Sequence, residues 1–177
     1  MSSISIQKTS IVNLDTDAIV NAANDGLWAG GGVCGAIFRA AGPELDDACA
    51  EVGECPTGEA RITPGFRLKA PYIIHTVGPI YSGTKQDALD LAACYRNSLD
   101  LAAANQIHSI AFPAISTGIY GYPLDEACEI ALVSVLSWLA DHMDYGMAVI
   151  FSCFDERTYA AYEKCINRME GKETETR

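Results

Sequence analysis

The sequence predicts a three-layer α/β/α sandwich with a mixed, largely parallel central sheet. Short apolar or alternating segments, typical of strands, take turns with longer segments whose apolar residues recur at helical spacing. Glycine and proline residues separate most of these segments, as expected at the ends of strands and helices. Such alternation along a chain favours mainly parallel strands with helices on both faces of the sheet.

The N-terminal half contributes four expected strands and two expected helices. The strand over Tyr72–Val77 is the clearest, because it is rich in β-branched residues and Gly78-Pro79 ends it. The first helix follows a run of glycines and ends at Gly42-Pro43, where the second begins. The expected strands are 3–7, 18–20, 60–63 and 72–77, and the expected helices are 33–41 and 43–52.

The C-terminal half contributes two strands and three helices. Pro113 ends a strand over Ser109–Phe112, while Pro123 and Asp125 are helix-start signals. The residues after Gly171 are polar, so we expect one domain over 1–170 and a flexible polar tail over 171–177. The other expected elements are a strand at 147–151 and helices at 88–102, 124–139 and 159–169.

Composition excludes several classes of protein. The 177 residues suit one globular domain, and no run approaches the roughly 18 apolar residues of a membrane span. The N-terminus lacks the pattern of a signal peptide, and the seven cysteines include no Cys-x-x-Cys, so we expect reduced thiols, a cytoplasmic location and no bound metal. A net charge of −11 disfavours duplex nucleic acid, so an anionic ligand must be held locally by backbone groups.

Three consecutive glycines, Gly30 to Gly32, precede the first expected helix. Bare backbone at a helix start can hold a phosphate, although a purely structural turn is an equal alternative for this pattern alone. Gly30-x-Gly32-x-x-Gly35 also matches the dinucleotide-binding fingerprint. In that fingerprint the strand runs directly into the glycines, whereas residues 21–29 intervene here, which argues against a dinucleotide site.

Three unusual segments each follow an expected strand. They are the Asn-rich and Gly-rich segment 21–35, the segment 113–123 with Ser116-Thr117-Gly118-Ile119-Tyr120-Gly121, and the segment 153–155 with Phe154. Ligands of open α/β sheets bind beyond the carboxyl ends of the strands. We therefore expect the three segments to meet at one cleft, with two loops suited to an anion.

Several motifs occur together and in a fixed order. They are Asn-Ala-Ala-Asn at 21–24, Gly-Gly-Gly-Val at 30–33, Ala-Ala-Gly-Pro at 40–43, Ile-His-Thr-Val-Gly-Pro at 74–79 and Phe-Pro-Ala-Ile-Ser-Thr-Gly-Ile-Tyr-Gly-Tyr-Pro at 112–123. In this combination the chain resembles the macrodomain family, in its branch of ADP-ribosyl hydrolases and O-acetyl-ADP-ribose deacetylases. The resemblance extends over residues 4–169.

The resemblance implies a ligand and a set of contacts. ADP-ribose would lie with Asn24 at its distal ribose, Tyr120 packed against that ribose, and Phe154 beside the adenine, near Ser10 and Ile11. The two loops that would grip the diphosphate through backbone N–H groups consist of Gly30, Gly31, Gly32 and Val33, and of Ser116, Thr117, Gly118, Ile119 and Tyr120. Neither a cofactor nor a metal is implied.

The chain departs from the family pattern at three positions. Ser10 stands where the family has an aspartate that reads adenine, which removes a carboxylate from the base site. Cys34 replaces the aspartate of the hydrolase branch that orients the attacking water, and Phe38 replaces a histidine four residues later.

Cys34 leaves three interpretations open. The thiol marks a protein that binds without turnover, or it is permissive while a phosphate oxygen of the ligand activates water, or it is itself reactive at the first turn of a helix. The catalytic candidates are thus Asn24 and Cys34, with Asp25 as a weaker substitute for the missing carboxylate. His75 suits a packed position within a strand, and Asp155 suits a helix cap.

The expected function is binding of ADP-ribose with hydrolysis of an ester bond at the distal ribose. The substrate would be mono-ADP-ribosyl Asp or Glu on a protein, or O-acetyl-ADP-ribose. The alternative is a non-catalytic reader of ADP-ribose, because of Cys34. Partners are expected to be ADP-ribose or ADP-ribosylated protein, without duplex nucleic acid or membrane.

Overall fold

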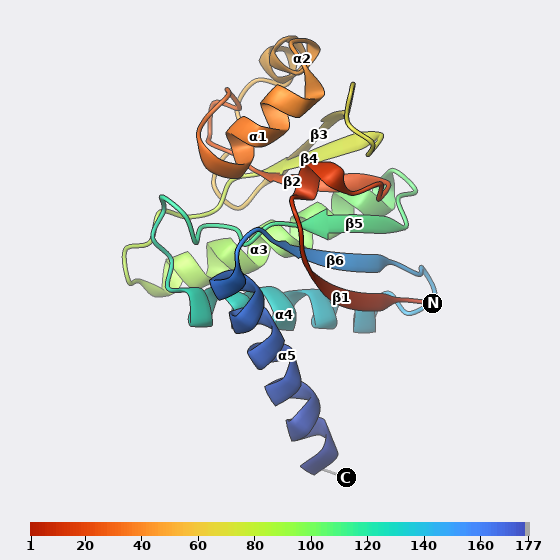
Figure 1. Ribbon diagram of the computed structural model, residues 1–177, viewed down its shortest axis with the longest axis vertical. Helices are drawn as coiled ribbons and strands as arrows, with labels where there is room; N and C mark the ends of the chain where they lie inside the picture. Colours follow the sequence, from red (N-terminus) through yellow and green to blue (C-terminus); the bar gives the residue numbers. More distant parts are fainter. Residues whose placement is uncertain (176–177) are drawn as a thin grey trace.

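A six-stranded mixed sheet forms the centre of the protein (Figure 1). The computed structural model describes the backbone of residues 1–175 and the side chains of residues 1–171. The strands are β1 (Ser3–Lys8), β2 (Ala18–Ala22), β3 (Ala60–Pro64), β4 (Tyr72–Thr76), β5 (Ser109–Phe112) and β6 (Ala148–Cys153). Their order is β1-β6-β5-β2-β4-β3, and every neighbouring pair is parallel except β3 with β4. The predicted fold class is therefore confirmed.

Helices cover both faces of this sheet. They are α1 (Gly32–Ala41), α2 (Glu44–Val52), α3 (Lys85–Ala104), α4 (Leu124–Asp141) and α5 (Glu156–Glu175), with a short 3-10 helix, η1, at Ile11–Asn13. Ile19 and Ile73 pack under α1 and α2, whereas Val20 and Ile74 pack in the cluster that contains α3, α4 and α5. Alternate residues of the central strands thus serve opposite faces, which explains their continuous apolar sequences.

The helix starts follow local capping signals. Thr84 and Asp87 form a capping box, so α3 begins three residues before the expected start at Ala88. Asp155 Oδ1 accepts the backbone N–H of Thr158 at 2.8 Å and begins α5, which confirms the expected cap. α3 therefore starts at the Thr84 hydroxyl and α5 at the Asp155 carboxylate, and each accepts an N–H group of the first helical turn.

The C-terminal end of α5 overlaps the expected tail. Residues 171–175 continue α5 as helix, and the flexibility expected of 171–177 stays a prediction. A single glycine costs a helix only about 1 kcal/mol, and the lysine and glutamates that follow Gly171 are good helix formers. The remainder of the predicted tail, 176–177, lies outside the described residues.

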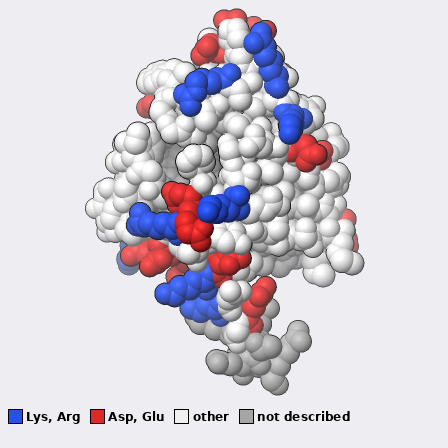
Figure 2. All heavy atoms as spheres, in the orientation of Figure 1, with Lys and Arg blue, Asp and Glu red and all other residues white. Residues whose placement is uncertain are grey.

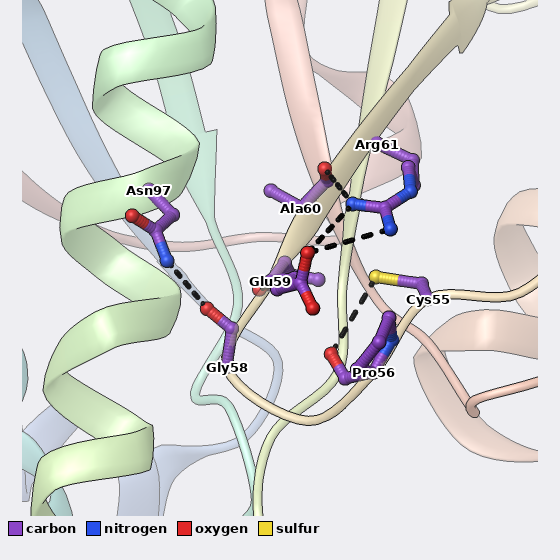
Figure 3. Close-up of polar contacts among 8 residues, drawn as sticks. Cys55, Pro56, Gly58, Glu59, Ala60, Arg61 and Asn97 are labelled. Atoms are coloured by element: carbon purple, nitrogen blue, oxygen red, sulfur yellow. Dashed lines mark hydrogen bonds and ion pairs between the residues drawn. The ribbon is translucent and has the colours of Figure 1, made fainter.

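Polar contacts of the segment 55–61, within itself and with α3, lie at the edge of the sheet (Figure 3). Asn97 on α3 donates to the Gly58 carbonyl oxygen at 2.7 Å, and the Gly58 N–H donates to Val77 O at 2.8 Å. Arg61 forms an ion pair with Glu59 at 3.4 Å on the same edge. These contacts fix the chain just before Gly78, where β4 leads into a loop beside the candidate site.

Candidate functional site

A continuous groove lies at the carboxyl ends of β2, β5 and β6. Three adjoining cavities of about 200, 440 and 280 Å³ make up this groove, and we call them the inner, middle and outer cavities. Val33 and Pro113 line all three cavities. Figure 2 shows a largely uncharged hollow between α1 and the start of α5, with charged side chains at its margin. The groove is therefore one site with three compartments.

The structure brings together all of the predicted site residues. Each of them lines at least one of the three cavities, as expected from strands whose carboxyl ends share one edge. The inner cavity contains Asn24, Gly30, Gly31, Val33, Cys34, Ser116, Gly118, Ile119 and Tyr120; the middle cavity adds Thr117 and Phe154; the outer cavity adds Ser10, Ile11 and Gly32. Their individual contacts with a ligand remain predictions.

The first loop presents bare backbone at the start of α1. Gly31 precedes the helix in an extended conformation and offers no capping side chain, while Gly32 has a positive φ of 56°. The first N–H groups of a helix have no partner within the helix, so those of this turn are available to an anion. At Gly35 an added Cβ would lie 2.5 Å from the Gly30 carbonyl oxygen, so only glycine permits this close approach.

The second loop is held by the neighbouring β4–α3 loop. Ser116 has a left-handed backbone, with φ of 67°, and its hydroxyl donates to the Pro79 carbonyl oxygen at 2.8 Å. The Tyr81 N–H donates to the Tyr120 carbonyl oxygen at 2.9 Å. Ile119 is 91% exposed at the tip of this loop. A fixed base with an exposed tip suits a loop that closes over a ligand.

Asn24 combines a structural contact with a position in the inner cavity. Its Nδ2 donates to the Trp28 carbonyl oxygen at 2.9 Å, and its Oδ1 accepts the Trp28 N–H at 3.1 Å. These bonds close the turn that leads from β2 to the glycines. A second N–H of the amide and a second lone pair of Oδ1 remain, so the side chain can still bind a hydroxyl group.

Cys34 lies in the first turn of α1, at the floor of the inner cavity. Its side chain is buried, with the sulfur 3.8 Å from Nδ2 of Asn21 and 3.7 Å from the Trp28 carbonyl oxygen. Phe38, one turn later, is buried in the core and does not line the groove. The sulfur is thus the one side-chain atom of α1's first turn that faces both the cavity and a buried amide.

A buried polar chain lies beneath Cys34. Thr63 donates its hydroxyl to the Pro64 carbonyl oxygen at 3.2 Å, so it accepts the Nε2–H of His75 at 2.9 Å. The free Nδ1 of that ring then accepts from Asn21 Nδ2 at 3.0 Å. Burial lowers the pKa of His75 to about 4. His75 is therefore neutral and packed, as the sequence indicated, and has no access to the groove.

The inner cavity has no carboxylate in its lining that could act as a general base for an attacking water. Asp25, the weak substitute proposed from the sequence, is exposed and lines none of the three cavities. Asp155 lines the middle cavity, but the N–H of Thr158 bonds to its carboxylate and lowers its pKa. The lining of the inner cavity includes neither a carboxylate nor an imidazole. Hydrolysis there would need a base from the ligand.

Sequence reasoning missed two cations that line the groove. Arg39 lines the outer cavity and Arg157 the middle one, and neither forms an ion pair with another described residue. Arg39 lies in the last turn of α1, so its sequence position gave no signal that its guanidinium lines the groove. Arg157 follows Asp155 at the start of α5, where the same strand end delivers Phe154.

Three other features of the chain bear on function. All seven cysteines lie within the described residues, and each is a buried, free thiol. Across residues 1–175, no cluster of three or more His, Cys, Asp or Glu side chains has the arrangement of a metal site. No helix in this part of the chain is both long and apolar enough to cross a bilayer. The groove is therefore the best-supported site.

Comparison with known proteins places this groove in a family. The family model described as Macro domain matches residues 20–131. This chain belongs to the macrodomain family. A macro domain-containing protein of Chlorobaculum tepidum is 53% identical over 160 residues, which cover 90% of this chain and 92% of that protein.

Two further macrodomain relatives have names or ligands that bear on function. The O-acetyl-ADP-ribose deacetylase of Klebsiella pneumoniae is 53% identical over 161 residues, covering 88% of this chain and 91% of that protein. The structure of the Trypanosoma brucei macrodomain in complex with ADP-ribose is 45% identical, with a TM-score of 0.88, and covers 92% of this chain and 68% of that chain. The macrodomain fold is thus shared with a protein whose structure contains ADP-ribose.

Proposed function

We propose that the groove binds ADP-ribose and that the protein hydrolyses ester-linked ADP-ribose. The observation that supports this most directly is the set of groups along one groove. Both backbone loops line the inner cavity together with Asn24 and Cys34, whereas Phe154 lines the middle and outer cavities. This division suits a ligand with a diphosphate and a distal ribose on one side and an adenine base on the other.

Backbone donors and local cations explain how an acidic protein binds an anion. The net charge of −11 repels a diphosphate at long range, whereas the first turn of α1 offers N–H groups and the positive end of a helix dipole. Arg39 and Arg157 add positive charge at the groove. At short range these groups outweigh the distant carboxylates, since salt screens charges separated by more than about 8–10 Å.

Hydrolysis would use the ligand itself to activate water. Because the inner cavity has no carboxylate or imidazole, a phosphate oxygen of the bound substrate accepts the proton of the attacking water. The water oxygen bonds to the reacting carbon, the ester C–O bond breaks, and the proton ends on the released group. Asn24 holds the distal ribose in position, and fixed geometry of this kind supplies a large part of a barrier reduction.

A second candidate function is a reader that binds ADP-ribose without turnover. Cys34 favours it, because the carboxylate that takes a proton from water in the hydrolase branch is replaced here by a sulfur side chain. The candidate substrates are mono-ADP-ribosyl Asp or Glu on a protein and O-acetyl-ADP-ribose.

Calorimetry with ADP-ribose and a turnover assay on both substrates test these functions. Hydrolysis predicts binding together with release of ADP-ribose, whereas a reader predicts binding alone. The control is Gly31→Val, whose extended backbone tolerates valine while the added side chain occupies the inner cavity. Absence of binding by the wild-type protein at millimolar ADP-ribose would exclude both candidates.

A further inference from the structure

We infer that the outer cavity accepts a 6-oxopurine base at least as well as adenine, with Arg39 as the residue that recognises it. This inference rests on the proposed binding of a nucleoside diphosphate ribose in the groove. It extends the ligand class from ADP-ribose to the inosine or guanosine analogue. Three observations in the outer cavity support it.

The first observation is the position of Arg39. The residue lies in the last turn of α1, yet its guanidinium reaches back along the helix, since a Cβ added at Gly35 would lie 3.0 Å from Nη1 of Arg39. Side chains on a helix lean toward its N-terminus, and the bare backbone of Gly35 leaves room for this one. Arg39 thereby lines the outer cavity instead of the C-terminal end of α1.

The second observation is that this guanidinium is free. Arg39 has neither a hydrogen bond nor an ion pair with any other described residue, so all five of its N–H donors are available. The four ion pairs of the described chain use other cations. Arg39 is also the only charged residue among those that line the outer cavity.

The third observation is the rest of the cavity lining. Phe154 is 75% exposed and offers its ring as a stacking surface for a base. Ser10 contributes a hydroxyl that has no hydrogen-bond partner among the described side chains and backbone groups, and it can donate or accept. A carboxylate, which would accept the exocyclic amine of adenine, is not among these lining residues.

The hydrogen-bond donors of this lining favour one kind of purine base over the other. Arginine binds the O6 and N7 acceptors of a 6-oxopurine in a bidentate manner, whereas adenine presents an amine at position 6 that repels a guanidinium donor. Adenine retains only N7 as an acceptor on that edge. The Ser10 hydroxyl can accept the N1–H of a 6-oxopurine or donate to the N1 of adenine, so it does not discriminate. Arg39 therefore sets the preference.

A contact between Arg39 and the diphosphate would predict a different outcome. The diphosphate is identical in the adenosine and inosine ligands, so such a contact contributes equally to both. The discriminating quantity is the ratio of the two dissociation constants, and its response to a substitution at position 39.

The test is calorimetric titration of the full chain with ADP-ribose and with inosine diphosphate ribose, which differ only at position 6 of the base and in the hydrogen on N1. We expect inosine diphosphate ribose to bind as tightly as ADP-ribose or more tightly. Arg39→Gln should weaken the inosine ligand by about 5- to 150-fold and ADP-ribose by less than about threefold. The control Arg96→Gln removes the same charge from an exposed position on α3 outside all three cavities, and should leave both affinities unchanged.

A second test is Ser10→Asp, which adds a carboxylate to the outer cavity, whereas Arg39→Gln removes a positive charge from it. The carboxylate accepts the amine of adenine and neutralises Arg39, so the ratio of affinities should move at least tenfold toward ADP-ribose. Wild-type binding of inosine diphosphate ribose more than threefold weaker than that of ADP-ribose would overturn the inference. Equal loss of both ligands in Arg39→Gln would overturn the role of Arg39. Failure of both ligands to bind the wild type would instead refute the proposed function.

Discussion

The side-chain nitrogen of Asn21 lies 3.0 Å from Nδ1 of His75, and both side chains are completely buried. The same amide nitrogen faces the sulfur of Cys34 at 3.8 Å. A neutral ring in the core therefore fixes the orientation of an amide that points toward the floor of the inner cavity. This arrangement connects the stability of the sheet with the chemistry of the groove.

Stability should depend on the protonation of His75. Its pKa is lowered from 6.5 to about 4 by burial, so the unfolded chain binds more protons than the folded one between these pH values. The contribution of neutral His75 to the free energy of unfolding should therefore be fully present above pH 6.5. The free energy of unfolding should fall by up to about 3 kcal/mol as the pH drops to 4. Urea denaturation of wild type and of His75→Gln at pH 7.5, 6.0 and 5.0 measures this dependence.

The exposed ring of His108 provides the control for that experiment. His108→Gln should keep the wild-type pH dependence, whereas His75→Gln should lose stability at pH 7.5 but show a smaller further loss on acidification. Parallel curves for wild type and His75→Gln would contradict the buried, neutral state of His75.

Cys34→Asp should increase turnover by at least tenfold over wild type. A carboxylate at this position would lie at the N-terminal turn of α1 and could accept from Asn21 Nδ2, so both the helix dipole and the amide stabilise its charge. The group could then take a proton from water beside the distal ribose. Release of ADP-ribose from a mono-ADP-ribosylated protein measures the effect.

Cys34→Ser is the matched control, because it keeps the size and neutrality of the side chain. We expect its affinity for ADP-ribose to stay within about threefold of wild type. An inactive Cys34→Asp variant that still binds ADP-ribose would show that a carboxylate at this position cannot complete the site.

Gly78→Ala should destabilise the protein by about 1–3 kcal/mol and weaken ligand binding. The added Cβ would lie 2.1 Å from Oγ of Ser116 and 2.6 Å from Cγ2 of Ile115, so the base of the second loop must move. Gly118→Ala, in the same loop, meets no atom within 4 Å and should leave the unfolding free energy within about 0.5 kcal/mol of wild type. Equal melting temperatures for the two variants would argue against a tightly packed loop base.

Phe154→Ala should weaken ADP-ribose binding by about 1–3 kcal/mol, which is the range measured for stacking of a base on an aromatic ring. Stability should be unaffected, because this ring is 75% exposed. Met143→Ala removes a side chain that is 78% exposed and lines none of the three cavities, and should change neither property. An unchanged affinity of Phe154→Ala for ADP-ribose would show that the adenine base does not stack on this ring.

Most of the secondary structure could be predicted from local patterns. The strand at Ser109–Phe112 has the predicted bounds, and Gly42 and Gly53 end α1 and α2 as expected. Other boundaries differ from the expected ones, among them the ends of β2 and β6, and at the start of α3 capping decides the outcome. Lys85 joins α3 because of the Thr84–Asp87 capping box, whose two hydrogen bonds do not follow from apolar spacing.

The candidate site was predictable to the level of loops. Motifs after three strand ends indicated which segments meet, because parallel strands deliver their carboxyl ends to one edge. The direction of individual side chains was not predictable. Arg39 has the sequence position of a helix C-terminal cation, yet its guanidinium lies over Gly35 and lines the outer cavity.

The sequence alone determined the order of strands and helices along the chain and the glycine loop at Gly30–Gly32, since these depend on residue type and local spacing. The resemblance to the family added that Cys34 replaces a carboxylate. Only the tertiary structure decided that His75 supports Asn21 beneath that thiol, that Asp155 is occupied as a cap, and that Arg39 remains free. Hydrogen bonding and burial are properties of neighbours brought together from distant positions. A side chain's protonation and availability therefore follow from packing, which local sequence patterns do not contain.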